Sequence, residues 1–247
     1  MFPDVDEAGL PTFLLVTCEH AGREVPEPYR QLFAGADDVL EGHRGYDHGA
    51  LGVALRLGAK CSAPLIFTTT TRLLVECNRP LHHPALFSEF TAALSDAEKR
   101  RIVAAYHEPH CRSVERAVAS AIQAGMRVLH VGVHSFTDVL DGQVRDVDVG
   151  VLFDPSRPDE TAISEAWIAE LGRQRGDYRI RANEPYAGID ECLVSTLREK
   201  FSADRYLGVE IEVRQGLVPT EEQQHAMGDL LAATLARVVG FRSRSEG

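Results

Sequence analysis

The chain has 247 residues, of which 44% are hydrophobic and 26% are charged. This composition is typical of a globular protein, and the length suffices for one large domain that buries roughly three-quarters of its unfolded surface. The formal net charge of −11 makes nucleic acid and anionic membranes unfavourable partners, because both would repel the surface on average. A small acidic ligand is compatible with this charge, since a few arginines at a binding site outweigh the average negative potential of the surface.

The sequence points to a cytoplasmic protein. The segment Met1–Gly9 is acidic and has no apolar core, so no signal peptide is predicted, and no apolar run approaches the ~20 residues of a membrane span. The five cysteines are an odd number without a C-x-x-C pair, which favours reduced thiols in a cytosol. The sequence does not determine the oligomeric state, and a homo-oligomer is compatible with it.

Short apolar runs alternate with helical patterns, which predicts one layered α/β domain over residues 1–247 with loosely ordered tails at 1–10 and 241–247. Two of the helices begin at capping boxes, Ser95 with Glu98 and Thr220 with Gln223. In chain order, the predicted elements are strand Thr12–Cys18, helix Gly49–Leu57, strands Pro64–Thr69 and Leu73–Cys77, a helix from Ser95 to about Gln123, strands Val128–Val133 and Val149–Phe153, helices Asp159–Arg173 and Ile189–Phe201, strand Leu207–Val213, and a helix from Thr220 to before Gly240.

Side chains suited to metal binding follow directly after several predicted strands. His20 comes after Thr12–Cys18, and His134 comes after Val128–Val133. In open α/β sheets, ligands bind outside the carboxyl ends of the strands, so we expect both histidines at one rim. A catalytic zinc site takes about three nitrogen or oxygen ligands and leaves one position open for water. We therefore predict that His20 and His134 bind a divalent metal ion, with Zn²⁺ as the first choice.

Two residues compete for the place of third ligand. Asp47 precedes a predicted helix and reaches the rim from there, so it is preferred. Glu19 is the rival, although as the neighbour of His20 it could point away or support a ligand from behind. Glu212 is the predicted general base, because a lone carboxylate on a buried strand is otherwise costly.

Each of these residues also has a purely structural interpretation. A histidine at a strand end is often a satisfied structural residue, and Asp47 is in a position to cap the helix that follows it. Glu210 and Glu212 alternate with apolar residues, as in a strand with one solvated face. His107 and His110 are three residues apart on the long helix, where they face either the site or the surface.

Arginines near predicted strand ends are candidates for substrate binding, because a guanidinium donates two parallel hydrogen bonds to a carboxylate. Arg72, Arg79 and Arg145 all lie in or beside such loops. Asn78 offers an amide to an oxyanion or a substrate carbonyl. We expect Arg72, Asn78 and Arg145 to bind substrate and Arg79 to take part in catalysis. The alternative for any one arginine is a surface pair with one of the 37 acidic residues.

Six short segments carry a recognisable combination of residues over about 12–220. They are Val16–Gly22 (VTCEHAG), Gly45–Ala50 (GYDHGA), Arg72–Arg79 (RLLVECNR), His134–Thr137 (HSFT) with Arg145 downstream, Asn183–Gly188 (NEPYAG) and Gly208–Arg214 (GVEIEVR). No single segment is specific, but together and in this order they resemble the N-formylglutamate amidohydrolase family.

This resemblance implies a three-layer α/β/α fold with a central mixed, mostly parallel sheet, like that of zinc carboxypeptidases. It also implies hydrolysis of the formyl amide of N-formylglutamate, a small acidic N-acyl amino acid, by metal-assisted attack of water. The residues that it assigns are the metal ligands His20, Asp47 and His134, the base Glu212, and the substrate contacts Arg79, Arg145, Asn183 and Tyr186. In the expected mechanism, Glu212 accepts a proton from the attacking water and returns it to the departing amine, while Arg79 or Asn78 stabilises the oxyanion.

The chain departs from the family pattern in two places, and these departures concern the substrate more than the reaction. Relatives often have Asp-Leu-Asn-Arg where this chain has Glu76–Arg79. The residues Glu19–Gly22 are typical of a side branch of the family. Another N-acyl amino acid or a short peptide with a free carboxylate is therefore an alternative substrate. A ligand-binding member without activity is a further alternative. A nucleophilic Cys18 is disfavoured, because neighbours in an extended chain point to opposite faces.

Overall fold

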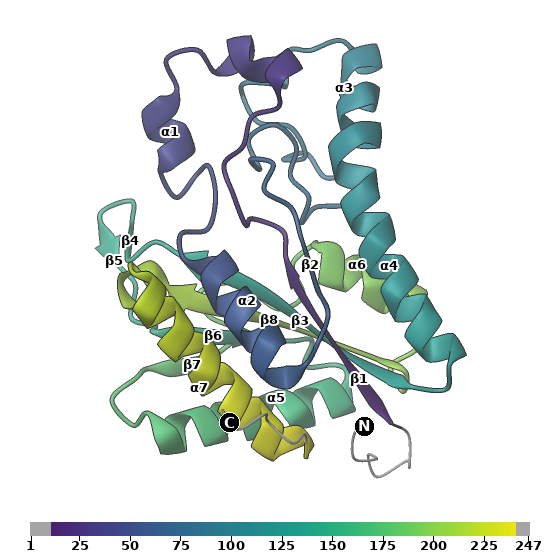
Figure 1. The fold of residues 1–247 in the computed structure, drawn as a ribbon, viewed down its shortest axis with the longest axis vertical. Coiled ribbons are helices and arrows are strands. Elements are labelled where there is room, and N and C mark those ends of the chain that lie inside the picture. Colours follow the sequence, from purple (N-terminus) through teal and green to yellow (C-terminus); the bar gives the residue numbers. More distant parts are fainter. Residues whose placement is uncertain (1–10, 241–247) are drawn as a thin grey trace.

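The computed structural model describes residues 11–240, and its centre is a six-stranded β-sheet (Figure 1). In spatial order the strands are β2 (Leu65–Phe67), β1 (Thr12–Cys18), β3 (Arg127–Phe136), β8 (Tyr206–Arg214), β6 (Val149–Leu152) and β7 (Ile180–Ala182). The first four run parallel, whereas β6 pairs antiparallel with β8 and parallel with β7. The predicted mixed, mostly parallel sheet is confirmed. The two predicted tails lie outside the described residues.

Helices cover both faces of this sheet, which gives the predicted three layers. One core joins the sheet to α2, α5 and α7, and a second core joins its other face to α4 and α6. The helical segments are η1 (Glu27–Phe33), α1 (Asp37–Glu41), α2 (Ala50–Cys61), α3 (Asp96–Ile102), η2 (Val103–His107), α4 (Glu108–Gln123), α5 (Pro158–Gln174), α6 (Leu193–Lys200), η3 (Gln215–Leu217) and α7 (Glu221–Val239).

Both predicted capping boxes place their helices correctly. The Ser95 hydroxyl accepts a hydrogen bond from the backbone N–H of Glu98, and the Thr220 hydroxyl accepts one from the N–H of Gln223. These bonds satisfy N–H groups that a helix start otherwise leaves without a partner. The long helix predicted from Ser95 forms as α3 and α4, joined by the π-helical turn η2.

The strand predicted at Leu73–Cys77 is wrong. This segment forms turns above the carboxyl end of the sheet, where Leu73, Leu74, Val75 and Cys77 pack into a third core with η1 and α1. Figure 1 shows these parts at the top of the molecule, above the sheet. The segment is apolar because it is buried on all sides, and periodicity alone does not distinguish such a run from a buried strand.

The strand predicted at Val128–Val133 extends beyond its predicted end, which changes the setting of the candidate site. β3 continues to Phe136, so His134 lies within a strand, as Glu212 does in β8. The alternation of Glu210 and Glu212 with apolar residues does not mark a solvated face, because both glutamates are buried. Parallel pairing aligns the Cα of Glu212 with that of His134. Glu210 and Glu212, on one face of β8, therefore face a polar interior.

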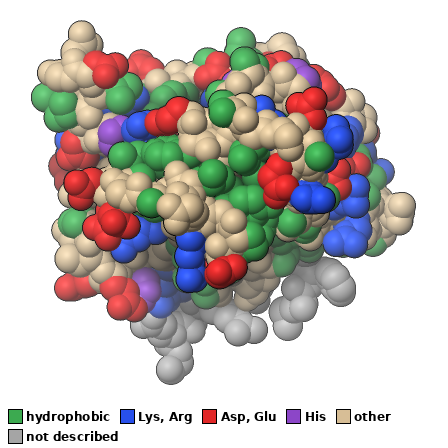
Figure 2. All heavy atoms as spheres, turned by 90° about the horizontal axis from the view of Figure 1, so that it is seen from above, with side chains coloured by type: hydrophobic (Ala, Val, Ile, Leu, Met, Phe, Trp, Pro, Cys, Tyr) green, Lys and Arg blue, Asp and Glu red, His purple; other side chains and the backbone are tan. Residues whose placement is uncertain are grey.

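The structure also contains a small antiparallel hairpin that the sequence did not indicate, β4 (Val139–Leu140) with β5 (Gln143–Val144). Within residues 11–240, no helix combines the length and the apolar character needed to cross a membrane. On the face shown in Figure 2, acidic and basic side chains are interspersed, so the negative net charge does not gather there in one patch.

Gly49 holds the start of α2 close to the rest of the site. It has a φ of 77°, in the left-handed region that favours glycine, and a Cβ added there would lie 2.6 Å from the carbonyl oxygen of Val218. Two residues earlier, the N–H of Asp47 donates to the carbonyl of His20 at 3.0 Å. The turn through Gly49 thus sets where the Asp47 carboxylate points.

We predict that Gly49→Ala lowers the free energy of unfolding by more than about 2 kcal/mol, because backbone strain and a backbone clash add together. Gly35→Ala is the matched control, since Gly35 has the same φ of 77° but would bring its Cβ within 4 Å of no other atom. The control should lose only the strain of about 1 kcal/mol. Urea unfolding of both variants tests this, and equal losses would show that the contact with Val218 is unimportant.

Candidate metal centre

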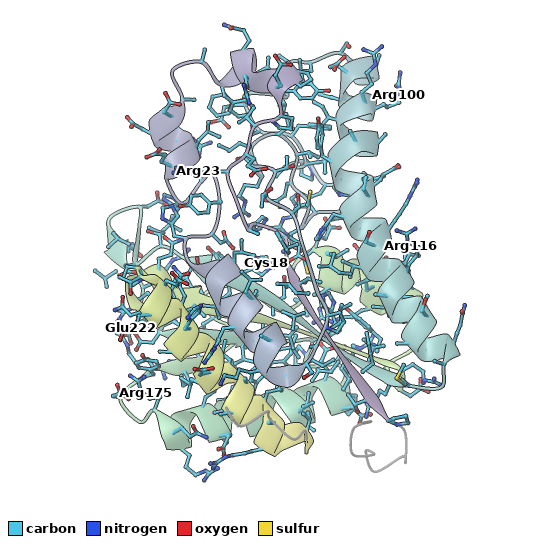
Figure 3. The ribbon with its side chains drawn as sticks, viewed as in Figure 1. Cys18, Arg23, Arg100, Arg116, Arg175 and Glu222 are labelled. Carbon is cyan, nitrogen blue, oxygen red and sulfur yellow. The ribbon has the colours of Figure 1, made fainter. Side chains whose placement is uncertain are left out.

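Three buried side chains from different parts of the fold meet at the carboxyl end of the sheet. His20 follows β1, Asp47 precedes α2, and His134 belongs to β3. The Nδ1 atoms of the two histidines lie 3.2 Å apart, and Asp47 Oδ2 lies 3.2 Å from the first and 3.0 Å from the second. In Figure 3 the label of Cys18, at the end of β1, marks this level of the molecule, and His20 comes two residues later.

The spacing of these three atoms fits a metal ion. Ligand atoms around a tetrahedral zinc, with bonds of about 2.0–2.1 Å, lie about 3.3 Å from one another. Two imidazole nitrogens and a carboxylate oxygen are ligands of the kind that zinc accepts. The structure thus brings together the three predicted ligands in a set of the right size and chemistry.

The far nitrogen of each histidine contacts carboxylates. His20 Nε2 lies 2.5 Å from Glu76 Oε1, and His134 Nε2 lies 3.2 Å from Glu19 Oε2 and 3.4 Å from Glu210 Oε1. A proton on Nε2 satisfies these acceptors and leaves the lone pair of Nδ1 facing the cluster. This is the arrangement by which carboxylates orient metal-binding histidines. Glu19, the rival third ligand, thus contacts a ligand from behind.

Arg72 neutralises part of the negative charge around the cluster. Its Nη1 donates to Asp47 Oδ1 at 3.1 Å and its Nε donates to Glu76 Oε2 at 2.7 Å. Burial opposes ionisation of Glu76, but Arg72 and His20 hold the pKa of its carboxyl well below the usual range. Glu19, Glu210 and Glu212 are also buried nearby. This excess of buried carboxylates favours a bound cation, because an uncompensated buried charge is costly.

Glu212 has one buried carboxylate oxygen, Oε2, without a partner among the described residues. Burial raises the pKa of Glu212 to about 8, with Asp47 and Glu210 adding repulsion, whereas His134 and His20 lower it. Strand pairing sets Glu212 beside His134, so an oxygen free to exchange a proton stands next to a predicted ligand.

Cys18 lies at the end of β1 but is not a candidate nucleophile. It is fully buried, and burial raises the pKa of its thiol far above the usual range. A thiolate is the reactive form of cysteine, so this environment opposes reactivity. All five cysteines are free thiols that form no disulfide bond.

A cavity of about 330 Å³ opens onto one side of the cluster. Asp47, Arg72 and Glu76 lie at its inner end, and apolar or aromatic side chains form much of its wall. The other lining residues are His43, Arg44, Leu73, Ala85, Phe87, Ser88, Glu89, Ser135, Phe136, Thr137, Leu140, Tyr186 and Gln215. A polar centre at the inner end of such a cavity is the usual form of a small-molecule site.

Comparison with known proteins agrees with this geometry. Residues 12–218 match the family described as N-formylglutamate amidohydrolase. The chain belongs to this family. Its members hydrolyse amides by the family description, so the chain is classed as an amidohydrolase.

Two solved structures show the same fold. The gene product Atu2144 of Agrobacterium tumefaciens is 31% identical, with a TM-score of 0.81 over 92% of this chain and 90% of that one. The N-formylglutamate amidohydrolase of Ralstonia eutropha JMP134 is 19% identical, with a TM-score of 0.59 over 98% of this chain and 97% of that one. No protein of curated function matches the chain significantly.

The predicted substrate-binding residues divide into two groups within this amidohydrolase. Arg72 and Tyr186 line the cavity, and Arg145 lies over the ring of Tyr186, 4.9 Å from its centre, and donates to its hydroxyl. Asn78 instead donates to Glu210 at 3.1 Å and accepts from the N–H of Leu193, so its amide supports the region behind His134.

Arg79 and Asn183 do not line this cavity. The guanidinium of Arg79 donates to the backbone carbonyl of Glu191, and Arg79 lines a second cavity between α4 and α6. The carboxamide oxygen of Asn183 accepts from the N–H groups of Phe153 and Gly188, which fixes a loop. A contact of either residue with substrate therefore stays a prediction.

Three residues that contact the ligand set or its supports are not among the predicted site residues. Glu76 lies in a segment with the pattern of a strand, the alternation around Glu210 also fits a strand with one solvated face, and the spacing of His110 fits either the site or the surface. His110 Nε2 lies 3.3 Å from Glu19 Oε1. The i, i+3 spacing of His107 and His110 was the available signal, since both are buried on the inner side of the helix.

We predict that Arg72→Met lowers the free energy of unfolding of the metal-free protein by about 3 kcal/mol, because Asp47 and Glu76 would remain buried without their cation. Arg44→Met is the control, since the ion pair of Arg44 with Glu89 is exposed and is worth at most about 1 kcal/mol. Denaturant unfolding in the presence of a chelator measures both. A loss of stability no larger for Arg72 than for Arg44 would contradict the charge balance described above.

Proposed function

We propose that this protein is a metal-dependent amidohydrolase that cleaves the amide of a small N-acyl amino acid, with N-formylglutamate as the representative substrate. The observation that carries the proposal is the convergence of His20, Asp47 and His134 on one point, with Glu212, whose Oε2 has no partner among the described residues, paired beside His134 in the sheet. The family membership supports the reaction class.

His20, Asp47 and His134 would hold the ion, and their outer contacts would keep each ligand atom aimed at it. A bound divalent metal supplies a positive charge that lowers the pKa of a water and polarises the acyl oxygen. Asp47 lines the cavity, so a water and an acyl oxygen would reach the ion from that side. This requirement for an open position is what separates catalytic from structural zinc sites.

Glu212 would act as general base and then as general acid. Its free Oε2 takes a proton from the water that attacks the acyl carbon, and the same oxygen returns the proton to the amine nitrogen as the C–N bond breaks. The products are the free acid and the amino acid. Burial suits this role, since a raised pKa brings a carboxyl close to the operating pH of a proton shuttle.

Arg145 is our candidate for the group that binds a substrate carboxylate. It has no carboxylate partner among the described residues, and its guanidinium lies against the rings of Phe136 and Tyr186, which line the cavity. By contrast, Arg72 and Arg44 are already paired with acidic side chains. An arginine held by aromatic faces loses little freedom when it binds a carboxylate.

A second candidate substrate follows from the cavity wall. Leu73, Phe87, Phe136, Leu140 and Tyr186 provide more apolar surface than a formyl group and a glutamate side chain require. This favours an N-acyl amino acid with an apolar acyl group or side chain. Hydrolysis of formyl, acetyl and succinyl derivatives of glutamate, aspartate and glutamine, compared with N-acyl leucine and phenylalanine, separates the two.

We predict that the purified protein binds about one zinc ion per chain, and that Glu212→Gln removes nearly all turnover while leaving the zinc content unchanged. The amide of Gln keeps the size of the side chain but does not accept and return a proton, a function worth about 10²–10⁴-fold in rate. His134→Ala is the contrasting variant and should lose both zinc and activity. Wild-type turnover in Glu212→Gln would eliminate this residue as the base.

We further predict that Arg145→Gln raises KM for the best acidic substrate by roughly 10–100-fold with little change in kcat, since a hydrogen bond to a charged group contributes about 1.5–3 kcal/mol. Arg100→Gln is the control, because this exposed arginine lies on α3, far from the site in Figure 3. Steady-state kinetics provide both constants. An unchanged KM would move the carboxylate site elsewhere.

A further inference from the structure

We infer that His110 of α4 is a positioning residue of the metal centre, which acts on the ligand His134 through the carboxylate of Glu19. This inference rests on the metal centre of the proposed function and assigns a role to two residues outside the ligand set. It makes α4 part of the catalytic apparatus rather than only a cover for the sheet.

Glu19 is held between two imidazole rings. Its Oε1 lies 3.3 Å from His110 Nε2, and its Oε2 lies 3.2 Å from His134 Nε2. All three side chains are buried, with residue exposures of 2%, 6% and 2% for Glu19, His110 and His134. Both carboxylate oxygens thus contact histidine nitrogens, one in a hydrogen bond with His110 and one in an ion pair with His134, and these contacts at opposite ends hold the orientation of the carboxylate.

The direction of these bonds follows from what each atom offers. If the Nε2–H groups of His110 and His134 both donate to Glu19, Nδ1 of His134 keeps its lone pair toward His20 and Asp47. Nδ1 of His110 is buried and has no partner among the described residues. Leaving that atom as an unprotonated acceptor avoids a buried donor without a partner. The tautomer protonated on Nε2 therefore suits both His110 and His134.

The backbone of α4 makes His110 a rigid support. Val114, Val118 and Ala121 on the following turns pack against Leu15 and Val128 of the sheet. Ahead of His110, the π-helical turn Val103–His107 shifts the phase of the helix, and such turns are frequent at functional sites. His107 and His110 both end on the buried side, but His107 Nε2 donates to the backbone carbonyl of Arg79 and does not contact the cluster.

Loss of His110 would leave Glu19 Oε1 buried without a donor. The carboxylate would then be free to turn, and the Nε2–H of His134 would depend on Glu210 Oε1, at 3.4 Å, as its remaining acceptor. Outer contacts of this kind typically change metal affinity by 10–100-fold. Because His110 is one residue further from the ion, we expect an effect at the lower end of this range.

The test is zinc affinity, measured on the full chain by competition with a chromophoric chelator. We expect His110→Leu to weaken zinc binding by about 10-fold. His110→Gln should restore affinity to near the wild-type value, because the amide nitrogen of Gln occupies the place of Nε2 and donates to Glu19. His107→Leu is the matched control, a buried histidine one turn away on the same helix, and should bind zinc like the wild type.

Glu19→Gln and the double variant with His110→Leu test the route of the effect. If His110 acts through Glu19, the double variant binds zinc no more weakly than Glu19→Gln alone, whereas additive losses would overturn the route. Wild-type affinity in His110→Leu would overturn the inference and leave the proposed function intact. A wild-type chain that binds no zinc would refute the proposed metal centre itself. Should His110→Leu fail to fold, His110→Asn replaces it, because its shorter amide does not reach Glu19.

Discussion

The structure depends on the contacts between buried imidazoles and buried carboxylates at the carboxyl end of the sheet. Neither kind of group is stable there alone, because burial penalises each charge and each polar atom without a partner. The far nitrogens of His20 and His134 are satisfied by glutamates, which leaves three ligand atoms that face one another. A divalent cation would satisfy these three atoms together. The outer contacts thus favour a bound cation as much as the three facing atoms do.

The pairing of β3 with β8 produces both the core and this centre. Odd-numbered residues of the two strands, such as Val133 and Ile211, enter the apolar core, and the even-numbered His134 and Glu212 stand side by side on the other face. A shift of one residue would exchange the two sets and bury the charged groups among α2, α5 and α7. The apolar pattern that fixes the strand register therefore also fixes the distance between His134 and Glu212.

Much of this arrangement could be predicted from the sequence, for local reasons. The helix starts at Ser95 and Thr220 depend on side chains three residues apart, and His20 follows a strand that is apolar on both faces. The resemblance to the family then supplied the grouping of ligands that spacing alone left open.

The outer contacts could not be predicted, because they depend on segments distant in the chain. Glu76 reaches His20 only because the apolar run around it folds into a separate core, where a strand was expected. Glu210 has the spacing of a solvated strand face, but contacts with Asn78 and with Cys192 at the start of α6 help to bury it. Periodicity records which residues share a face, but it does not record whether another element covers that face.

The segment 72–89 joins the chemistry to the choice of substrate. Arg72 and Glu76 contact the ligands from one end of it, while Leu73 and Phe87 form part of the cavity wall. The first pair is fixed by several charged hydrogen bonds, whereas the apolar pair makes contacts that other side chains of similar size can replace. Substitutions in the wall therefore have room to change which acyl amino acid fits without moving the ligand atoms. In the proposed function, the polar centre accounts for the reaction class, and the apolar half of the same segment would select the substrate.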